Sequence, residues 1–363
     1  MKKKIKIGIL FGGKSAEHEV SLQSAKNVCD ALDPEKYEPV LLGIDKSGRW
    51  FLLDQQDFLL DSEDPKQIRL RDSGLPIVLV PGGGGRIVHA STLRPETFVD
   101  LIFPILHGPF GEDGTVQGLL KLADLPFVGA GVLGSAIGMD KDVMKRLLRD
   151  AGLPIGKFAV LKSQEPAPNF AALAEKLGLP LFVKPANMGS SVGVSKVQTE
   201  TEYQQGIAEA FLYDNKIIIE EYIEARELEC SVLEDEGPAA SVPGEVISTH
   251  EFYSYNAKYI DENGAVLAIP AKIPPETAEK VRALAVKTFQ TLNAEGLSRV
   301  DFFLKPNGAI LVNEINTLPG FTKISMYPKL WEASGLSYPR LIDKLIGIAR
   351  RRFEKEKRLK TTI

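Results

Sequence analysis

One stretch near the end of this 363-residue chain, Arg299–Asn316, constrains the fold more than any other. At its centre stands Asn307-Gly308, two residues that tolerate positive φ, and apolar, β-rich runs flank the pair on both sides. This pattern predicts two antiparallel strands joined by a two-residue turn. Counting outward from Pro306 opposite Ala309 then sets the register of the whole hairpin.

The predicted register brings polar side chains together on one face of the hairpin. It sets Asp301 opposite Glu314 and Arg299 opposite Asn316, because side chains alternate between the two faces of a strand. A single inserted residue in either strand would undo this register. The other face is apolar and is expected to meet the core; it consists of Val300, Phe302, Leu304, Leu311 and Ile315.

Two carboxylates directly opposite each other repel, so Asp301 and Glu314 favour a cation between them. Carboxylate and amide oxygens are the hard ligands that magnesium prefers, together with substrate phosphates. The hairpin therefore predicts a platform for a metal-bound nucleotide. A hairpin face that is simply solvated is the alternative.

The composition, with 44% hydrophobic and 25% charged residues, is that of an ordinary globular chain. A net charge of -4 gives no reason to expect nucleic acid or an anionic membrane as a partner, and no apolar run is long enough to span a bilayer. The lysine-rich start, Met1–Lys6, leads into a strand rather than a signal-peptide core. With only Cys29 and Cys230, neither disulfides nor zinc are expected, which favours the cytoplasm.

The chain is expected to open with a strand over Ile5–Phe11, a polar loop over Gly12–Glu19 and a helix over Ser21–Leu32. Open α/β sheets bind ligands beyond the carboxyl ends of their strands, where this loop lies. Gly8–Ser15 also satisfies the Walker A pattern, but a phosphate loop there would expose Ile9-Leu10-Phe11 to solvent. A buried strand is therefore the preferred interpretation.

A second strand is predicted over Tyr37–Ile44 and a third over Val99–Leu106, with an irregular surface insertion, Asp45–Thr97, between them. The third strand leads into a polar loop, His107–Gly114, and then a helix over Val116–Leu122. Polar residues again follow the end of a strand, so this loop is a second candidate for the ligand site.

Gly129–Gly134 has the spacing G-x-G-x-x-G of dinucleotide-binding loops. Val132-Leu133 are expected to continue the loop, because the amphipathic helix begins only at Asp140, a suitable N-cap, and stops at Gly152. The motif alone is weak. A nicotinamide-dependent dehydrogenase is kept as an alternative class.

A stronger phosphate-binding pattern is the small-residue loop Ala186–Gly193, between a strand over Leu179–Pro185 and a returning strand over Val194–Val197. Glycine and serine allow backbone amides to approach phosphate closely, and Lys184 on the first strand supplies positive charge. A flexible hairpin without a ligand is the alternative.

Glu251–Gly264 is a polar loop that contains four aromatic residues and one lysine, which is typical of a lid over an active site. A surface flap is the alternative. Strands are expected before it, over Ile217–Tyr222 and Arg226–Val232, and helices after it, over Pro275–Leu292 and from Tyr338 onward.

Eight segments of the chain, in order and spread over nearly its whole length, resemble the D-alanine–D-alanine ligases of the ATP-grasp superfamily. They are Gly12–Ser21, His107–Gly114, Met139–Lys141, Lys184–Gly193, Glu220–Ile223, Tyr255–Tyr259, Arg299–Asp301 and Glu314–Gly320. The insertion at 45–97 points to the longer subgroup of that family. The resemblance implies an α/β fold, α+β in the ATP-binding part, in which an ATP-grasp fold follows an N-terminal domain with an open parallel sheet.

Three domains are implied by the resemblance. Residues 1–129 would form an N-terminal α/β substrate-binding domain, 130–223 a central ATP-grasp domain with the glycine/serine loop, and 224–363 a C-terminal ATP-grasp domain with the lid and the metal hairpin. ATP would lie between the last two domains, and the amino acids would lie against the first. Family analogy also implies a homodimer.

The resemblance implies an ATP-dependent, ADP-forming acid–amino-acid ligase. The carboxylate of one D-alanine would attack the γ-phosphate of ATP, and the amine of a second would displace phosphate from the acyl phosphate through a tetrahedral intermediate. The product, D-alanyl-D-alanine, would serve peptidoglycan and cell-wall synthesis. Two magnesium ions, or manganese in their place, would assist. D-lactate or D-serine as acceptor, or a nucleotide-binding module without turnover, are the alternatives.

The matching motifs imply roles for individual residues. The ATP site would consist of Lys141, Lys184, Glu220, Glu221, Tyr222, Ile223, Glu227, Lys258, Asn313 and Glu314. The magnesium ligands would be Asp301, Glu314 and Asn316. The residues around the reacting groups would be Glu17, His107, Ser190, Tyr259, Arg299 and Gly320, with Ser325 and Met326 at the carboxylate of the second substrate.

Among these residues, Glu17 would bind the ammonium of the first D-alanine and hydrogen-bond with Ser190 and Tyr259, which ties the lid to the floor of the site. His107 would lie near the same alanine. Arg299, together with the backbone amide of Gly320, would face the developing oxyanion.

The lid departs from many family members, which carry acidic residues where this chain has Ser254 and Asn256. The departure concerns lid contacts more than catalysis. Lys258-Tyr259 favours an amine as the second substrate, because relatives that use D-lactate differ in this loop.

Overall fold

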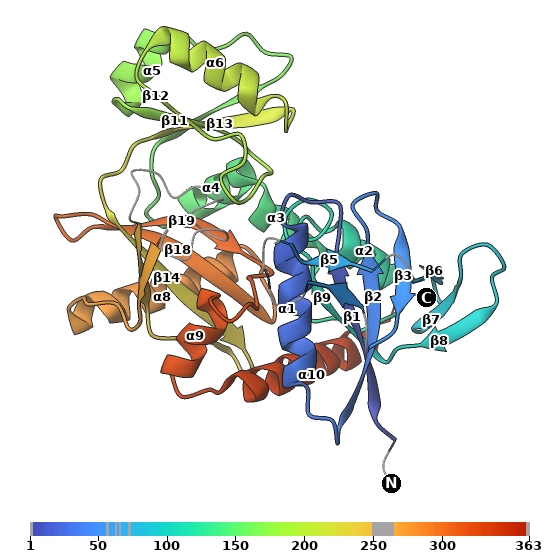
Figure 1. Ribbon diagram of the computed structural model, residues 1–363. Coiled ribbons are helices and arrows are strands. Elements are labelled where there is room, and N and C mark those ends of the chain that lie inside the picture. The colour runs from blue at the N-terminus through green and yellow to red at the C-terminus, as the bar shows by residue number, and fades with distance from the viewer. Residues whose placement is uncertain are drawn as a thin grey trace.

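The structure is a computed structural model that describes residues 3–55, 58–61, 64, 67–71, 74–248 and 265–360. Three main sheets follow one another along the chain, and Figure 1 shows the central one standing apart above the other two. The predicted lid, Glu251–Gly264, with Lys258 and Tyr259, lies outside the described residues.

The N-terminal sheet has seven strands in the order β8-β7-β6-β3-β2-β1-β9. Its strands are β1 (Ile5–Gly12), β2 (Tyr37–Ile44), β3 (Trp50–Leu53), β6 (Leu75–Leu79), β7 (Arg86–His89), β8 (Pro95–Phe98) and β9 (Leu101–Ile105). Strand β1 runs parallel to both β2 and β9, and the remaining pairs are antiparallel. The expected parallel sheet is therefore the centre of a larger mixed sheet.

The segment 45–97 was expected to be an irregular insertion, and that expectation is wrong. Strands β3 and β6 to β8 extend the N-terminal sheet outward from β2, while β4 (Leu59–Leu60) and β5 (Arg69–Leu70) form a separate ribbon. The strands are short, and glycines and prolines interrupt them, which hides the alternating pattern of a strand such as β6 in the sequence.

Helices cover both faces of the N-terminal sheet. On one face, Ile7, Ile9 and Phe11 of β1 pack with helix α1 (His18–Ala31) and with the C-terminal helix α10 (Tyr338–Glu356). On the other, Leu10 packs with helix α2 (Thr115–Leu122). Gly8 lies within β1, where an added Cβ would meet a side-chain carbon of Ile102 at 2.5 Å. This position confirms a buried strand instead of a Walker A loop.

The central sheet has four antiparallel strands in the order β10-β13-β11-β12. They are β10 (Phe158–Lys162), β11 (Leu181–Pro185), β12 (Ser195–Val197) and β13 (Lys216–Glu221). Helices α5 (Phe170–Leu177) and α6 (Glu200–Ala210) cover one face, with Leu173 and Tyr203 in the shared core. The small-residue loop joins β11 to β12, as predicted.

The C-terminal sheet is antiparallel, in the order β17-β16-β14-β18-β19, with β15 paired to β14. Its strands are β14 (Arg226–Glu234), β15 (Pro238–Ala240), β16 (Gly244–Ser248), β17 (Ala265–Ala268), β18 (Leu297–Leu304) and β19 (Ile310–Asn316). Helices α4 (Lys141–Asp150) and α8 (Pro275–Thr291) pack into the core of this sheet. Helix α9 (Met326–Ala333) contacts β14.

The cores cross the boundaries expected from the sequence. Helix α4 falls within 130–223 but contributes Met144 and Leu148 to the core of the C-terminal sheet. Helix α10 falls within 224–363 but contributes Leu341 and Leu345 to the core of the N-terminal sheet.

The turn of the β18–β19 hairpin differs from the predicted one. Gly308 N–H donates to the carbonyl of Lys305 at 2.9 Å, and Lys305 N–H donates to the carbonyl of Ala309 at 2.9 Å. The loop therefore has three residues, Pro306-Asn307-Gly308, and Gly308 adopts a φ of +83°. A glycine at positive φ after a type I turn is the common form of the three-residue hairpin loop.

A one-residue bulge in β19 compensates for the three-residue loop. Phe302 pairs with Val312, but Asp301 pairs with Glu314, so Asn313 is an extra residue on β19. The bulge restores the predicted pairs of Asp301 with Glu314 and of Arg299 with Asn316. Nearer the turn the face assignment was wrong: Ile310 and Val312 are buried in the core, whereas Leu311 is only half-buried and pairs with Phe303.

The G-x-G-x-x-G segment was expected to continue as a loop through Val132-Leu133, but helix α3 (Val132–Met139) begins there. The Gly131 N–H at its start donates to a carboxylate oxygen of Glu295 at 3.1 Å. A Cβ on Gly134 would meet the Asn293 carbonyl oxygen at 2.4 Å. The space in front of the motif is thus filled by this chain, which removes the support for a dinucleotide site.

Candidate active site

Two adjoining cavities lie beside the hairpin. The first, of about 330 Å³, is bounded by the face of the central sheet without helices and by β18 and β19. The second, of about 570 Å³, is bounded by the loops of the N-terminal sheet, the hairpin and the start of α9. Residues that line both cavities are Lys141, Gly189, Ser190 and Glu314.

Most of the predicted ATP residues line the first cavity. They are Lys141, Lys184, Glu220, Glu221, Tyr222, Ile223, Glu227, Asn313 and Glu314. Adjacent residues of a regular strand point to opposite faces, but the bulge lets both Asn313 and Glu314 line this cavity. The irregularity that restores the register thus also adds a side chain to the site.

Glu220 holds two lysines at the floor of the first cavity. Lys145 Nζ lies 2.7 Å from one carboxylate oxygen of Glu220, and the Lys184 ammonium pairs with the other. Burial opposes ionisation of Glu220, but the two ammonium groups outweigh it and lower its pKa to about 2. The carboxylate thus orients the lysines, and Lys184 stays charged beside the cavity.

Lys141 lies where the cavities meet, at the first residue of α4. Its Nζ donates to the carbonyl of Met188 at 2.7 Å and lies 3.8 Å from a carboxylate oxygen of Glu314. Burial lowers the pKa of Lys141, and the positive charge of Lys184 adds to the effect. An anion between these two ammonium groups would relieve their repulsion, which is the role expected of phosphate.

The small-residue loop reaches from the central sheet to the N-terminal domain. Ser190 and Ser191 adopt positive φ values of 51° and 60°, which is uncommon outside glycine. Ser190 Oγ donates to a carboxylate oxygen of Glu17 at 2.5 Å. This contact was expected from the family resemblance and is present here. Tyr259, the third member of that set, lies outside the described residues.

His107 is buried in the wall of the second cavity. Its Nδ1 lies 3.1 Å from the carbonyl of Leu318, which only accepts, so Nδ1 carries the proton. The buried Nε2 has no hydrogen-bond partner among the described residues. Burial lowers the pKa of His107, so the ring is neutral and Nε2 is an acceptor. An ammonium ligand would satisfy it.

Arg299 and Asp301 form a two-pronged pair on the hairpin face. Arg299 Nε and Nη2 each donate to one carboxylate oxygen of Asp301 at 2.7 Å, and Glu229 Oε2 lies 2.8 Å from Arg299 Nε. The Asn316 side-chain amide donates to Asp301 at 3.0 Å. Arg299 lines the second cavity, where its planar guanidinium suits an anionic oxygen.

The donor chemistry of the hairpin fits magnesium. Asp301 and Glu314 stand opposite each other, and the side-chain amide of Asn316 lies next to Asp301. The Asp301 carboxylate accepts from Arg299 and Asn316, and its oxygens are ligands of the kind that magnesium prefers. Within the described residues no three His, Cys, Asp or Glu side chains gather to hold a metal, so a third ligand would be the Asn316 amide oxygen.

Gly320, in the loop before α9, and Ser325 and Met326, at the start of α9, also line the second cavity. The Ser325 hydroxyl accepts from Thr322 N–H at 2.9 Å and lies 2.8 Å from the Thr322 hydroxyl. A Cβ on Gly320 would meet Ser325 Oγ at 2.7 Å, so a larger residue there would displace the Ser325 hydroxyl.

Three further residues of the site carried no role in the sequence-based prediction. Glu112 lines the second cavity and accepts from Gly108 N–H at 2.7 Å and Leu318 N–H at 3.3 Å. Burial raises its pKa to about 8, and the negative charge of Glu17 adds to this. Lys145 forms an ion pair with Glu220, and Glu229 forms one with Arg299. Spacing could have identified both, because Lys145 follows Lys141 by one helical turn and Glu229 shares a face with Glu227.

The comparisons with known proteins agree with this geometry. Residues 6–130 match the family model described as the D-ala D-ala ligase N-terminus, and residues 147–347 match the model of the D-ala D-ala ligase C-terminus. The chain is 54% identical to a D-alanine–D-alanine ligase of Oceanobacillus iheyensis over 361 residues, 99% of each chain. It is also 54% identical to D-alanine–D-alanine ligase A of Escherichia coli K12 over 362 residues, 99% of this chain and 100% of that protein.

Solved structures are similar over almost the full length. The D-alanine-D-alanine ligase of Coxiella burnetii aligns with a TM-score of 0.86 and 39% identity, covering 98% of this chain and 96% of that one. The VanG D-Ala:D-Ser ligase of Enterococcus faecalis aligns with a TM-score of 0.84 and 35% identity, covering 96% of this chain and 100% of that one. Within the described ranges, no helix has both the length and the apolar composition to cross a bilayer. The chain therefore belongs to the D-alanine–D-alanine ligase family, and its fold is the ATP-grasp α/β fold.

Proposed function

We propose that this protein is an ATP-dependent ligase that joins two D-alanine molecules into D-alanyl-D-alanine for peptidoglycan synthesis. The observation that carries the proposal is the pair of adjoining cavities, which share Lys141, Ser190 and Glu314. One cavity has buried lysines suited to phosphates, and the other has an acid, a neutral histidine and an arginine suited to amino acids. Two substrates bound there would meet where the cavities join.

In the first step, a carboxylate oxygen of one D-alanine attacks the γ-phosphorus of ATP. The bond to the β-γ bridging oxygen breaks, ADP leaves, and an acyl phosphate remains. Lys141 and Lys184 neutralise the phosphate charge, since catalysis of phosphoryl transfer consists mainly of positioning and electrostatic stabilisation. Glu220, Glu221, Tyr222, Ile223, Glu227 and Asn313 complete the nucleotide site.

We assign magnesium to Asp301, Glu314 and Asn316. When bound, two magnesium ions, or manganese in their place, would neutralise phosphate oxygens and hold the nucleotide in line for transfer. The residues themselves form a rigid surface, because β18 and β19 pair on both sides of the bulge. Arg299 holds Asp301 in a fixed rotamer by its two hydrogen bonds.

The first D-alanine is bound through its ammonium by Glu17, with His107 Nε2 as a second acceptor. In the second step the amine of another D-alanine attacks the acyl carbon, the amine loses a proton, and the carbon–oxygen bond to phosphate breaks. Arg299 and the Gly320 amide stabilise the oxyanion of the tetrahedral intermediate. Ser325 and Met326 bind the carboxylate of the second substrate.

An acceptor other than D-alanine is the second candidate. The structure of a protein named a D-Ala:D-Ser ligase matches this chain over 96% of its length, so the fold accommodates more than one acceptor. Lys258 and Tyr259 in the lid favour an amine over the hydroxyl of D-lactate, by family resemblance.

The proposal extends to the setting of the protein. We place it in the cytoplasm as a homodimer, as for the family it resembles, and keep three domains at 1–129, 130–223 and 224–363. The succession of three sheets along the chain supports the division. Cross-linking or light scattering of the purified protein would test the dimer.

Phosphate release tests the reaction. The protein is incubated with ATP, magnesium and D-alanine, beside L-alanine and beside D-alanine plus D-lactate or D-serine, and the products are identified by mass. We expect release only with D-alanine present, and the D-alanyl dipeptide as the product. If the protein binds nucleotide but releases no phosphate under any of these conditions, it is a nucleotide-binding module without turnover.

A further inference from the structure

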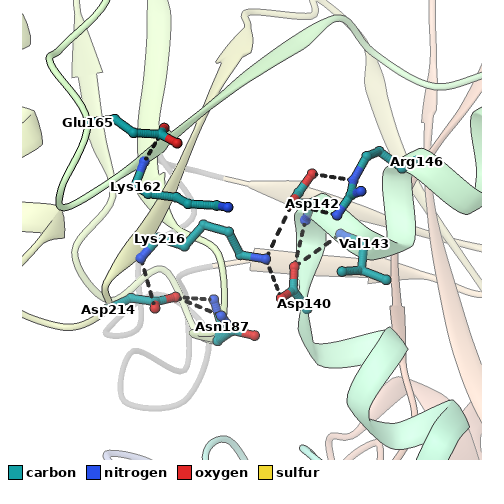
Figure 2. Close-up of polar contacts among 9 residues, drawn as sticks. All are labelled: Asp140, Asp142, Val143, Arg146, Lys162, Glu165, Asn187, Asp214 and Lys216. Atoms are coloured by element: carbon teal, nitrogen blue, oxygen red, sulfur yellow. Dashed lines mark hydrogen bonds and ion pairs between the residues drawn. The ribbon is translucent and has the colours of Figure 1, made fainter.

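A lysine outside both cavities holds the start of helix α4. Lys216 Nζ, from the first residue of β13, lies 2.5 Å from a carboxylate oxygen of Asp140 and 3.3 Å from one of Asp142. Figure 2 shows its ammonium between the two acids. The side chains of Lys216 and Asp140 are each 18% exposed and that of Asp142 is 8% exposed, so solvent screens the cluster only partly.

Asp140 makes two separate kinds of contact. Its Oδ1 accepts from the backbone N–H groups of Asp142 and Val143 at 3.1 Å, which caps the helix, and its Oδ2 binds Lys216. The cap alone would satisfy these backbone N–H groups at the start of the helix. The bond to Lys216 adds a constraint of another kind, because it ties the helix start to the central sheet.

The residue held at this point is Lys141, which follows Asp140 directly. Its backbone N–H donates to the carbonyl of Ala186 at 3.0 Å, and its Nζ donates to Met188 in the small-residue loop. The position of its ammonium in the first cavity therefore depends on where the helix begins relative to that loop.

Residues 214–216, at the start of β13, also hold the beginning of the small-residue loop. The carbonyl of Lys216 accepts from Ala186 N–H at 2.9 Å. Asp214 accepts from the backbone and side-chain N–H groups of Asn187 at 2.8 and 2.9 Å, and from Lys216 N–H at 3.1 Å (Figure 2). One turn, 214–216, thus joins the two elements that carry Lys141 and the small-residue loop.

We infer that Lys216 is a positioning residue for the ATP phosphates. Through its bond to Asp140, Lys216 fixes the position of the Lys141 ammonium relative to the small-residue loop. Asp214 fixes the start of that loop through Asn187. This inference rests on the proposed function, since it assumes that the first cavity binds ATP. Lys216 touches no substrate, so its effect reaches the nucleotide only through the bonds named above. An ion pair that serves stability alone is the competing explanation.

Lys216→Met keeps the length of the side chain and removes its charge. We expect the affinity for a non-hydrolysable ATP analogue with magnesium to fall about tenfold, within the usual range of coupling between sites. The KM for D-alanine should stay within about twofold, because Glu17 and His107 lie in the other cavity. Lys216→Arg, which keeps the charge, should restore nucleotide binding.

Lys162→Met is the matched control. Lys162 stands opposite Lys216 on the neighbouring strand β10, and within the described part of the chain its ammonium forms no ion pair with α4 (Figure 2). The same substitution there should leave nucleotide affinity unchanged. Asp140→Asn keeps a capping side chain, and Lys216→Met added to it should cause a smaller loss than in the natural chain, since only the contact of Lys216 with Asp142 at 3.3 Å then remains to be removed.

The outcomes separate the two proposals. No binding of the analogue by the unaltered protein would overturn both. Binding by the unaltered protein and equal binding by Lys216→Met would overturn the inference and leave the proposed function standing. A lower melting temperature with parallel losses for the nucleotide and D-alanine would reduce Lys216 to a stabilising ion pair.

Discussion

Ser190 and Glu17 meet through a hydrogen bond of 2.5 Å although 173 residues separate them in sequence. The bond joins the loop of the central sheet to the loop that follows β1, so it closes the site between two parts of the molecule that fold around different cores. Glu17 is buried and lines the second cavity. This contact joins the proposed amino-acid subsite to the small-residue loop.

Glu17→Gln should weaken the binding of the first D-alanine and leave ATP binding within about twofold. The amide is nearly isosteric but lacks the charge that attracts an ammonium, and the loss of a charged partner in a buried pair costs about 2–5 kcal/mol. Initial rates at varied D-alanine, with nucleotide affinity measured by calorimetry, provide the check. Equal loss of both affinities would count against the assignment.

Arg299→Ala should lower turnover by about 10²–10³-fold with little change in ATP affinity, because the charge that it meets develops only during reaction. The substitution also removes the guanidinium that pairs with Asp301 and with Glu229. Arg299→Lys keeps the positive charge but lacks the planar guanidinium, so it is the matched control. Melting temperatures of both variants reveal any loss of fold. Unchanged kcat in the alanine variant would contradict the assignment.

Asp301→Asn should raise the magnesium concentration needed for half-maximal activity by about tenfold or more, since a neutral amide is a poorer ligand than a carboxylate. Magnesium titrations of phosphate release measure this. Asp235→Asn is the control, because Asp235 is likewise a carboxylate in ion pairs, with Lys344 and Arg351, but lies outside both cavities. A normal magnesium titration for the Asp301 variant would remove Asp301 from the metal site.

Glu112 makes stability depend on pH. Its pKa in the fold is about 8, above the ordinary value of 4.5, so between these values the folded chain binds more protons than the unfolded one. Its contribution is therefore fully present below pH 4.5 and is lost as the pH rises through about 8. In Glu112→Gln this loss should vanish, so the variant should gain about 4 kcal/mol relative to the natural chain as the pH rises from 5 to 8.

The measurement is urea unfolding of both proteins at several pH values across that window. The quantity to follow is how the difference in unfolding free energy between the two proteins changes with pH. Its absolute value is less informative, because glutamine also alters a hydrogen bond to Gly108 or Leu318 at every pH. A difference that stays constant from pH 5 to 8 would show that Glu112 titrates normally.

Gly308→Ala should destabilise the protein by about 1 kcal/mol, because the residue adopts a φ of +83° in the three-residue loop. Apart from the two flanking residues, no atom of the described part of the chain lies within 4 Å of an added Cβ, so backbone strain is the main cost expected. Gly237→Ala has equally open space and no such φ, and it should be neutral or slightly stabilising. Equal unfolding free energies of the two variants would contradict the loop geometry.

The sequence alone determined the pieces with local signals. Period-two and helical patterns predicted β1, β2, the strands around the small-residue loop and the helices α4 and α8, and motif order predicted the family. Asp140 was identified as an N-cap from its type and place, and its carboxylate caps α4. Such features follow from propensities and spacing within a few residues, so they can be recognised without a fold.

Only the tertiary structure decided the rest. Asn313 bulges where Val312 N–H bonds to the carbonyl of Pro154, a contact from a distant segment that no turn motif reveals. The raised pKa of Glu112 and the partners of Lys216 likewise depend on burial and on neighbours from other elements. The sequence predicted most of the residues that line the two cavities, whereas packing decided their register, charge state and support, because these properties arise from contacts between segments far apart in the chain.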